Sequence, residues 1–556
     1  RSFTTSVVSD RQGNYQFPSL DAGQYQVWAQ AVGFEAARAE FALAGARVER
    51  NLTMTAIKDV GRIVKQMSGV EFLRSLPQST AADRRMVHVY KNNCTGCHTA
   101  SHALGNRWDA RGWGVLVDLM SVFPSTGEPV PAMRPTPERR GNPMINAYRD
   151  ELAEYLGRAR GPTELNDLKL LPRPAGEATR VVITEYDLPR TDGPLHFDNG
   201  SDWSMGTPSR FVGRAAHDVW PDADGNIWMA DDIVPNRTFA KLDPRTGKVT
   251  DYALKGHEGK TIGTHSIVVD HTGKVWGAGE EGAFVMLDPR TGQLKQFERP
   301  AGMKATVGGT LDVDSKGNPW ATSTNGAIKL DPATGVYTHY EGPPAPEGIC
   351  GAACGGWGTY GITVDRDDNA WATNPGLDRV LKIDSRTGTV TAVNLEPLVL
   401  PEATEVDRER RRTVRGGQNS APPGQKAPRR NAADPNADVV WTALYTSDRI
   451  ARIDTKTNQV KEYAMPTAYA SPYALAVDKN GAVWINTMNH DVITKFDPKT
   501  ERFTEYTLPT RGTEIRHVQV DNSTNPVTVW APYNRTNKVV RLQLRASTTQ
   551  QTRASR

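Results

Sequence analysis

Three residues between positions 94 and 98 have the types and spacing needed to hold an iron cofactor covalently. Cys94 and Cys97 are separated by two residues, and His98 follows directly. Two thiols one helical turn apart can each form a thioether with a haem vinyl group, and the adjacent imidazole then faces the iron. The cysteine pair alone would also suit a redox dithiol or a zinc site, but the histidine favours haem. We therefore predict one covalent haem c with His98 as the proximal iron ligand.

The sixth iron ligand is expected to be a methionine downstream of His98. Met120 lies at the end of a helix predicted over residues 109–123 and is our first choice. Met133 lies in a proline-containing loop and is the second choice. The alternative for Met120 is a purely structural place in the helical core. Ligation by histidine and methionine raises the reduction potential relative to two histidines, which suits an electron carrier.

The residues around this motif have helical periodicity. Residues 81–93 predict a helix that runs into Cys94. Residues 57–162 as a whole resemble a monohaem cytochrome c domain, which implies an all-α module. Haem attachment of this type takes place outside the cytoplasm, so the resemblance implies a periplasmic or otherwise exported protein. The chain begins at Arg1 without a signal-peptide pattern, and we expect that some N-terminal residues are missing or were cleaved.

A second cysteine pair lies far from the first. Cys350 and Cys354 flank a Gly-Ala-Ala segment in a glycine-rich loop. In an oxidising compartment these two thiols are expected to form a local disulfide, and a reactive dithiol is the alternative.

Internal repeats dominate residues 179–546. A tryptophan recurs at intervals of 43–70 residues, and six of the repeats carry a turn of the Asp-Pro-x-Thr-Gly type downstream. Each repeat has four short alternating runs, which predicts a seven-bladed β-propeller. Residues 182–189 copy residues 503–509, so we expect this early strand to complete the last blade and close the ring. The repeated tryptophans are Trp228, Trp276, Trp320, Trp371, Trp441, Trp484 and Trp530.

One position in six of the seven repeats is predicted to face the propeller axis, and the fifth repeat has an insertion there instead. It lies five residues before the aspartate that precedes the blade tryptophan, and the residues found there are His217, His265, Gly309, Tyr360, Tyr473 and Arg516. Asp232 and Glu280 each follow a blade tryptophan by four residues and could join His217 and His265. Such a cluster could act as a general base or bind a divalent metal, and a water-lined polar funnel is the alternative.

The motif Asp-x-x-Gly-x-x-Trp within these repeats resembles the virginiamycin B lyase (streptogramin lyase) family. That resemblance implies a magnesium site and a catalytic base built from a Glu-x-His motif, a second glutamate and a histidine of the preceding blade. Here Glu514 and His517 are three residues apart, and Asn534 and Tyr473 stand at the other two positions. A one-residue slip on a strand turns a side chain to the other face. Streptogramin lyase activity is therefore not expected.

The remaining segments are predicted to be structural. Residues 1–56 resemble a partial carboxypeptidase regulatory-like domain, which implies a small β-sandwich, and relatives of that domain sometimes bind carbohydrate. Residues 163–178 are expected to form a linker and residues 547–556 a frayed tail. Residues 395–438 interrupt the fifth blade with a proline-containing, arginine-rich stretch that predicts a mobile basic loop.

Composition narrows the function further. The 556 residues carry 67 Lys and Arg against 63 Asp and Glu, so the net charge is 67 − 63 = +4. This near-neutral balance disfavours nucleic-acid binding, and no apolar run is long enough for a membrane span. We predict an exported c-type cytochrome whose propeller binds a small molecule, a carbohydrate or a redox partner such as a dehydrogenase or oxidase. The alternatives are a lyase or hydrolase at the axial cluster, and a non-catalytic docking subunit of a respiratory complex.

Overall fold

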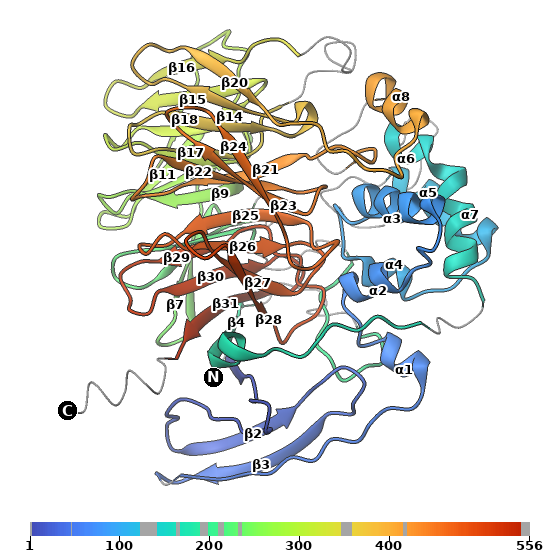
Figure 1. The fold of residues 1–556 in the computed structure, drawn as a ribbon. Coiled ribbons are helices and arrows are strands. Elements are labelled where there is room, and N and C mark those ends of the chain that lie inside the picture. Colours follow the sequence, from blue (N-terminus) through green and yellow to red (C-terminus); the bar gives the residue numbers. More distant parts are fainter. Residues whose placement is uncertain are drawn as a thin grey trace.

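The computed structural model describes residues 3–45, 47–122, 142–162, 167–189, 198–208, 216–231, 236–345, 358–414 and 420–545. A β-propeller makes up most of the molecule, helices cover one of its faces, and a hairpin lies beside the N-terminal end (Figure 1). None of the helices in the described ranges is long and apolar enough to cross a membrane.

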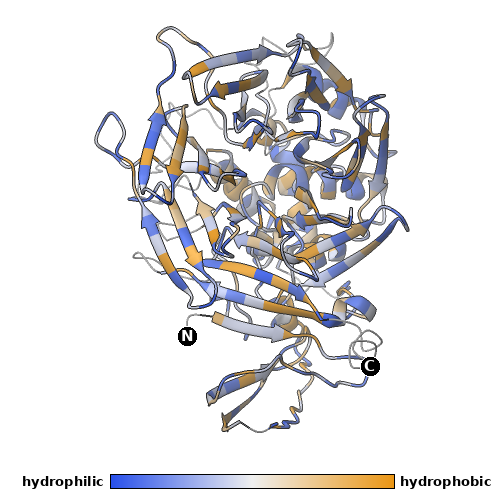
Figure 2. Ribbon diagram, turned by 90° about the vertical axis from the view of Figure 1, so that its left-hand side faces the viewer, coloured by the Kyte–Doolittle hydropathy of each residue, from blue (hydrophilic) through white to orange (hydrophobic). Residues whose placement is uncertain are grey.

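Seven antiparallel sheets stand around a central axis (Figure 2). The first three blades consist of β5 (Asp218–Pro221), β6 (Ile227–Ala230), β7 (Phe239–Asp243) and β8 (Lys248–Tyr252); β9 (Thr264–Val269), β10 (Val275–Gly279), β11 (Phe284–Asp288) and β12 (Gln293–Phe297); and β13 (Leu311–Val313), β14 (Pro319–Ser323), β15 (Gly326–Asp331) and β16 (Val336–Glu341). The next three consist of β17 (Ile362–Val364), β18 (Ala370–Asn374), β19 (Arg379–Ile383) and β20 (Val390–Asn394); β21 (Pro428–Ala433), β22 (Val439–Leu444), β23 (Arg449–Asp454) and β24 (Val460–Ala464); and β25 (Pro472–Val477), β26 (Val483–Thr487), β27 (Val492–Asp497) and β28 (Arg502–Thr507). The predicted seven-bladed propeller is confirmed.

The seventh blade is completed by a strand that precedes the propeller in the chain. It contains β29 (Gln519–Asp521), β30 (Thr528–Tyr533) and β31 (Lys538–Leu544), and β31 pairs with β4 (Val181–Asp187). The predicted ring closure is thus confirmed.

The N-terminal residues do not form two packed sheets within the described ranges. β1 (Phe3–Val7) pairs with β4 and becomes a fifth strand of the closing blade. β2 (Gly23–Ala29) and β3 (Ala37–Leu43) form a separate two-stranded hairpin. The β-sandwich expected for residues 1–56 therefore differs from the structure, because β1 satisfies the outer backbone groups of β4 instead.

A buried hydrogen bond explains the recurrent Asp and Trp of the blades. In five blades the indole Nε1 donates to the carboxylate of the aspartate six residues earlier, at 2.8–3.2 Å. The same carboxylates also accept backbone N–H groups of the turn, as Asp365 does from Asp367 and Asn369. The repeat motif is therefore a structural clamp between turn and strand.

Replacing Asp365 with alanine is expected to lower the free energy of unfolding by about 2 kcal/mol, because the buried Trp371 indole and two turn amides lose their acceptor. Thermal unfolding followed by circular dichroism measures the effect. Asp224→Ala, at an exposed position of the corresponding turn in blade one, serves as the control and should change stability by less than about 0.5 kcal/mol. Equal effects of the two substitutions would contradict the clamp.

The helical domain lies between the hairpin and the propeller in sequence. Its core contains Leu73, Val87, Tyr90, Trp113 and Leu152. The helix predicted over residues 109–123 is present as α5. The helices are α1 (Val60–Val64), α2 (Gly69–Ser75), α3 (Ala81–Cys94), α4 (Ala100–Leu104), α5 (Ala110–Val122), α6 (Pro143–Ala147) and α7 (Arg149–Ala159).

The basic insertion contains a helix that fastens the helical domain to the propeller. α8 (Glu405–Thr413) begins with a capping box between Thr404 and Asp407. The buried Asp407 carboxylate accepts two bonds from Arg85 of α3, each 2.7 Å, and one of 2.8 Å from Tyr148. The mobile loop predicted for this stretch is therefore wrong over the helix, because caps and long-range ion pairs order it.

Candidate functional site

The Cys94–His98 turn at the end of α3 lies directly on the propeller. The backbone carbonyl of Thr95 accepts a hydrogen bond from the Tyr445 hydroxyl at 3.3 Å. The side-chain hydroxyl of Thr95 accepts one from the Asn489 amide at 2.9 Å. The Gly96 carbonyl accepts one from Arg516 Nη2 at 3.1 Å. Because these three side chains come from blades five, six and seven, the propeller holds the turn at its axis.

The helix that carries the turn is anchored as well. The buried Lys91 Nζ donates to the Thr446 carbonyl at 3.0 Å and to Asp448 Oδ2 at 2.8 Å. On α2, the Val70 amide donates to the Asn489 carbonyl at 3.1 Å. Polar contacts from both α2 and α3 thus dock the helical domain on the propeller.

One hydrogen bond sets the tautomer of His98. Its Nδ1 lies 3.0 Å from the Thr99 carbonyl, so Nδ1 carries the proton and Nε2 keeps its lone pair. Burial lowers the pKa of His98 and keeps the ring neutral, which is the ligating form. Cys94 and Cys97 are free thiols. Burial raises the pKa of Cys94 to about 12 and also raises that of Cys97. These residues fit a covalently attached haem.

The other predicted ligands have different outcomes. Met120 lies at the C-terminal end of α5 with a half-buried side chain. Four of the predicted residues lie outside the described residues, and their roles stay predictions: Met133, Asp232, Cys350 and Cys354.

The predicted axial residues come together in a column. The His217 and His265 ring centroids are 3.9 Å apart, and the Tyr360 ring follows 6.4 Å from His265. Tyr360 and Tyr473 pack edge to face at 5.9 Å and share a hydrogen bond between their hydroxyls. At Gly309 a Cβ would lie 2.9 Å from His265 Cδ2, so glycine makes room for that ring.

Two residues that lie at the propeller axis were not identified from the sequence. Arg429 and Arg430 were assigned to the basic loop, but both are buried on β21. The Arg429 guanidinium lies 5.0, 4.8 and 5.3 Å from the ring centroids of Tyr360, Tyr445 and Tyr473. Arg429 also lies five residues before Asp434, so the rule that selected the other axial positions would have found it.

Arg430 forms a buried pair with Asp218. Its two terminal nitrogens donate to the carboxylate at 2.7 and 2.9 Å, and His217 Nδ1 lies 2.8 Å from the same carboxylate. Burial would raise the pKa of Asp218, but Arg430, His517 and His217 together lower it below its ordinary value. Asp218 is therefore a buried anion that orients the His217 ring.

The proposed carboxylate partners of the two histidines are placed differently. Glu280 is exposed after β10 and accepts a bond from the Gly263 amide at 3.2 Å. Glu514, compared in the sequence with the Glu-x-His motif of the lyase family, is buried and accepts bonds from Arg516 and Arg535 at 3.0 Å. Over the described parts of the chain, no group of three or more His, Cys, Asp or Glu residues is arranged to hold a metal ion.

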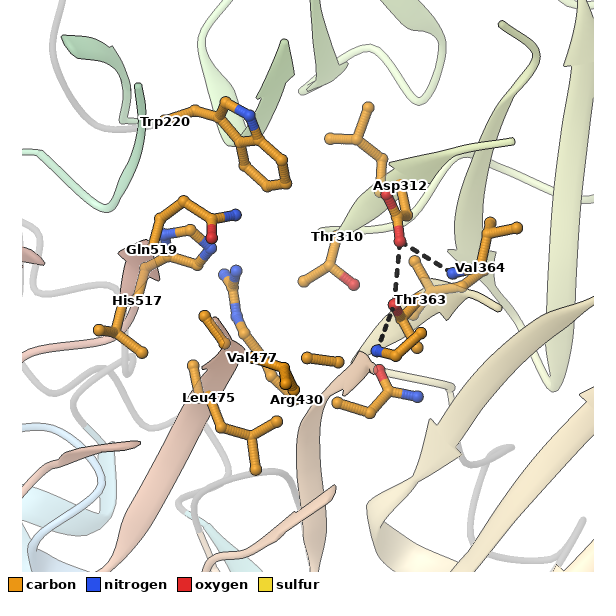
Figure 3. Close-up of a pocket in the computed structure, with 18 of the residues that line it drawn as sticks. Trp220, Thr310, Asp312, Thr363, Val364, Arg430, Leu475, Val477, His517 and Gln519 are labelled. Atoms are coloured by element: carbon orange, nitrogen blue, oxygen red, sulfur yellow. Dashed lines mark hydrogen bonds between the residues drawn. The ribbon is translucent and has the colours of Figure 1, made fainter. Parts of the chain in front are cut away.

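A pocket of about 420 Å3 lies at the other end of the axis (Figure 3). Its wall includes Val364, Ala433 and Val477, which end their inner strands, whereas the residues that contact the Cys94–His98 turn lie at the opposite strand ends. The Trp220 and His517 rings are stacked at 6.4 Å, and Arg430 and Thr310 also line the space. The pocket therefore offers flat rings and polar groups to a ligand.

Replacing His517 with glutamine is expected to weaken the pH dependence of stability. Burial lowers the pKa of His517 to about 4, against about 6.5 for an unfolded histidine. Between these two values only the unfolded chain takes up the proton, so acidification removes stability in this window and not above it. Urea unfolding at about pH 7 and about pH 4.5 measures the loss. His257→Gln at an exposed site should keep the wild-type loss, and an equal loss in His517→Gln would contradict the assignment.

The comparisons with known proteins agree with the propeller. A model of the Virginiamycin B lyase family matches residues 417–554, which contain blades five and six and the strands β29, β30 and β31 of blade seven. Virginiamycin B lyase from Staphylococcus aureus is 16% identical with a TM-score of 0.47, over 66% of this chain and 100% of that chain. A streptogramin B lyase structure is 18% identical with a TM-score of 0.49, over 67% of this chain and 100% of that chain. A chain of the mitotic checkpoint complex is 12% identical with a TM-score of 0.43, over 69% and 100%. No curated protein matches at a significant level. The sheet order shows a seven-bladed propeller, and its last part matches the virginiamycin B lyase family model.

Proposed function

We propose that this chain is an exported electron-transfer protein with one covalent haem c in its helical domain. The observation that carries the proposal is the Cys94-x-x-Cys97-His98 turn, in which the Nδ1 contact to the Thr99 carbonyl leaves Nε2 of His98 available for iron. In this proposal residues 57–162 are a cytochrome c-like domain and the compartment is the periplasm or its equivalent.

Each residue of the motif has one role in this proposal. Cys94 and Cys97 form the thioethers and His98 is the proximal ligand, with Met120 or Met133 as the distal ligand. When bound, haem supplies reversible one-electron transfer. The propeller excludes water from one side of the turn, since Tyr445, Asn489 and Arg516 occupy its polar groups.

The propeller is proposed to bind the substrate or the redox partner. Its pocket lies at the end of the axis that the helical domain leaves uncovered, and Trp220, His517 and Arg430 suit a small molecule or carbohydrate. A dehydrogenase or oxidase would exchange electrons with the haem. The N-terminal hairpin, with its carboxypeptidase regulatory-like sequence, is proposed as a spacer.

A reduced-minus-oxidised absorption spectrum of the full chain, produced with a c-type haem attachment system, tests the proposal. We expect a c-type α-band that withstands acid–acetone extraction, because the haem is covalent. The double variant Cys94→Ser/Cys97→Ser should lose all covalent haem, and His98→Ala should lose the native iron ligation. His257→Ala, at an exposed site away from the motif, is the control. A wild-type chain without the band would overturn the proposal.

A lyase or hydrolase at the axis is the second candidate. The observation in its favour is the buried His217–Asp218 pair next to His265, since a carboxylate that orients an imidazole is a general-base arrangement. His217→Ala and His265→Ala should abolish turnover of any lyase substrate found. If both retain the wild-type rate, the column is scaffold and a docking role for the propeller is favoured.

A further inference from the structure

A buried ion cluster of the seventh blade lies against the proposed haem turn. Glu514 is bonded by Arg516 Nε and Arg535 Nη2, each at 3.0 Å. The side chains of Glu514, Arg516 and Arg535 are only 0%, 7% and 1% exposed. With two guanidinium groups and one carboxylate, the cluster has a formal charge of +1.

The cluster contacts the turn between its two cysteines. Arg516 Nη2 donates to the carbonyl of Gly96, which lies between Cys94 and Cys97. Burial dominates the environment of the Cys97 thiol, and Arg535, Arg516 and Glu514 are the charges that act on it. Glu514 and Arg535 also act on His98. The field of the cluster therefore reaches one haem-bearing thiol and the proximal imidazole.

The cluster is held rigidly by its surroundings. The Arg535 backbone carbonyl accepts a bond from the Thr207 amide at 2.9 Å. At Gly206 a Cβ would lie 2.7 Å from Arg535 Cβ, so the chain passes very close to this arginine. Charges held in place in a water-poor site act more strongly than charges free to move in solvent.

We propose that the Arg516–Glu514–Arg535 cluster raises the reduction potential of the haem bound at Cys94–His98, so that the propeller tunes the electron carrier to which it is fused. This inference rests on the proposed function. Reduction adds one electron to the iron centre, from a donor such as dithionite, and a nearby buried positive charge stabilises that added negative charge. The two arginines favour the reduced state and Glu514 opposes it. All three are positioning residues that do not touch the iron.

Spectroelectrochemical titration of the full haem-loaded chain tests the proposal. We expect Arg516→Gln and Arg535→Gln each to shift the equilibrium constant for reduction about tenfold towards the oxidised form, which is about 59 mV for one electron. Glu514→Gln should shift it in the opposite direction. Arg516→Lys keeps the charge and should stay close to wild type. Arg386→Gln, at a surface site 86% exposed, is the control and should change nothing.

Opposite shifts for opposite charges are the result that a purely structural role would not produce. If the variants all move in one direction, or none moves, the tuning role is overturned while the haem proposal stands. If Arg516→Gln fails to fold, Glu514→Gln still gives the sign of the shift in reduction potential, and Arg516→Lys serves as the charge-conserving reference. A wild-type chain without haem overturns both proposals, and the absorption spectrum reports that separately.

Discussion

Replacing Asp407 with alanine is expected to loosen the helical domain from the propeller at a cost of about 3 kcal/mol. The buried Arg85 guanidinium would lose its two bonds of 2.7 Å, and the Tyr148 hydroxyl would lose its acceptor. The capping box of α8 would be lost as well, since Asp407 also accepts from the Thr404 amide at 2.8 Å. Removing one partner of a buried ion pair is costly because the other charge stays buried, and Arg85 would keep only Glu151 as a carboxylate partner.

Amide hydrogen exchange of α3 and α8 measures this effect as a local free energy of opening. Glu409→Ala provides the matched control on the same helix, because Glu409 pairs with Arg412 at the surface. Such exposed pairs contribute about 0–1 kcal/mol. If Asp407→Ala leaves the exchange of α3 unchanged, the insertion does not fasten the helical domain.

Replacing Thr184 with proline is expected to open the propeller ring and to destabilise it by roughly 4 kcal/mol. Thr184 lies in the middle of β4, where it is paired with Arg541 of β31 on one side and Thr5 of β1 on the other. Proline lacks the backbone N–H that the sheet needs, so a strand with a partner on each side does not tolerate it. A broken closure would also expose the edge of β31 to association with other chains.

Thermal unfolding and size-exclusion chromatography detect both consequences. Thr184→Ala keeps the N–H and should cost only about 1 kcal/mol, without association. A proline variant that stays monomeric and unfolds at the same temperature as the alanine variant would show that β4 is dispensable for closure.

The sequence alone was sufficient to predict those parts of the fold and the site that recur along the chain. The tryptophan spacing predicted the blades, the copied strand predicted β4 as the closing strand, and counting back from each aspartate predicted the column of His217, His265, Tyr360 and Tyr473. Blade five was the exception. Its Arg429 lies the same five residues before Asp434, but it was assigned to the basic insertion that precedes this blade and was therefore left out of the axial set.

Contacts between distant residues could not be predicted from one sequence. Arg85 and Asp407 are 322 residues apart, and nothing in the local pattern of either links them. β1 likewise pairs with β4 because the ring leaves an edge there, which is a property of the finished sheet. The Cys94-x-x-Cys97-His98 motif was visible in the sequence, but its place on the propeller axis was not, since that depends on residues of three separate blades.

The side chains that hold the Cys94–His98 turn have a consequence for the order of assembly. Tyr445, Asn489 and Arg516 follow the turn residues that they bind by 350, 394 and 420 positions in the chain. Chains are made from the N-terminus and domains fold as they emerge, so the turn exists before the groups that cover it. In the folded chain, burial raises the pKa of the Cys94 thiol to about 12, so little of it is in the reactive thiolate form. Covalent attachment at these cysteines is therefore expected to precede the folding of the last three blades around the turn.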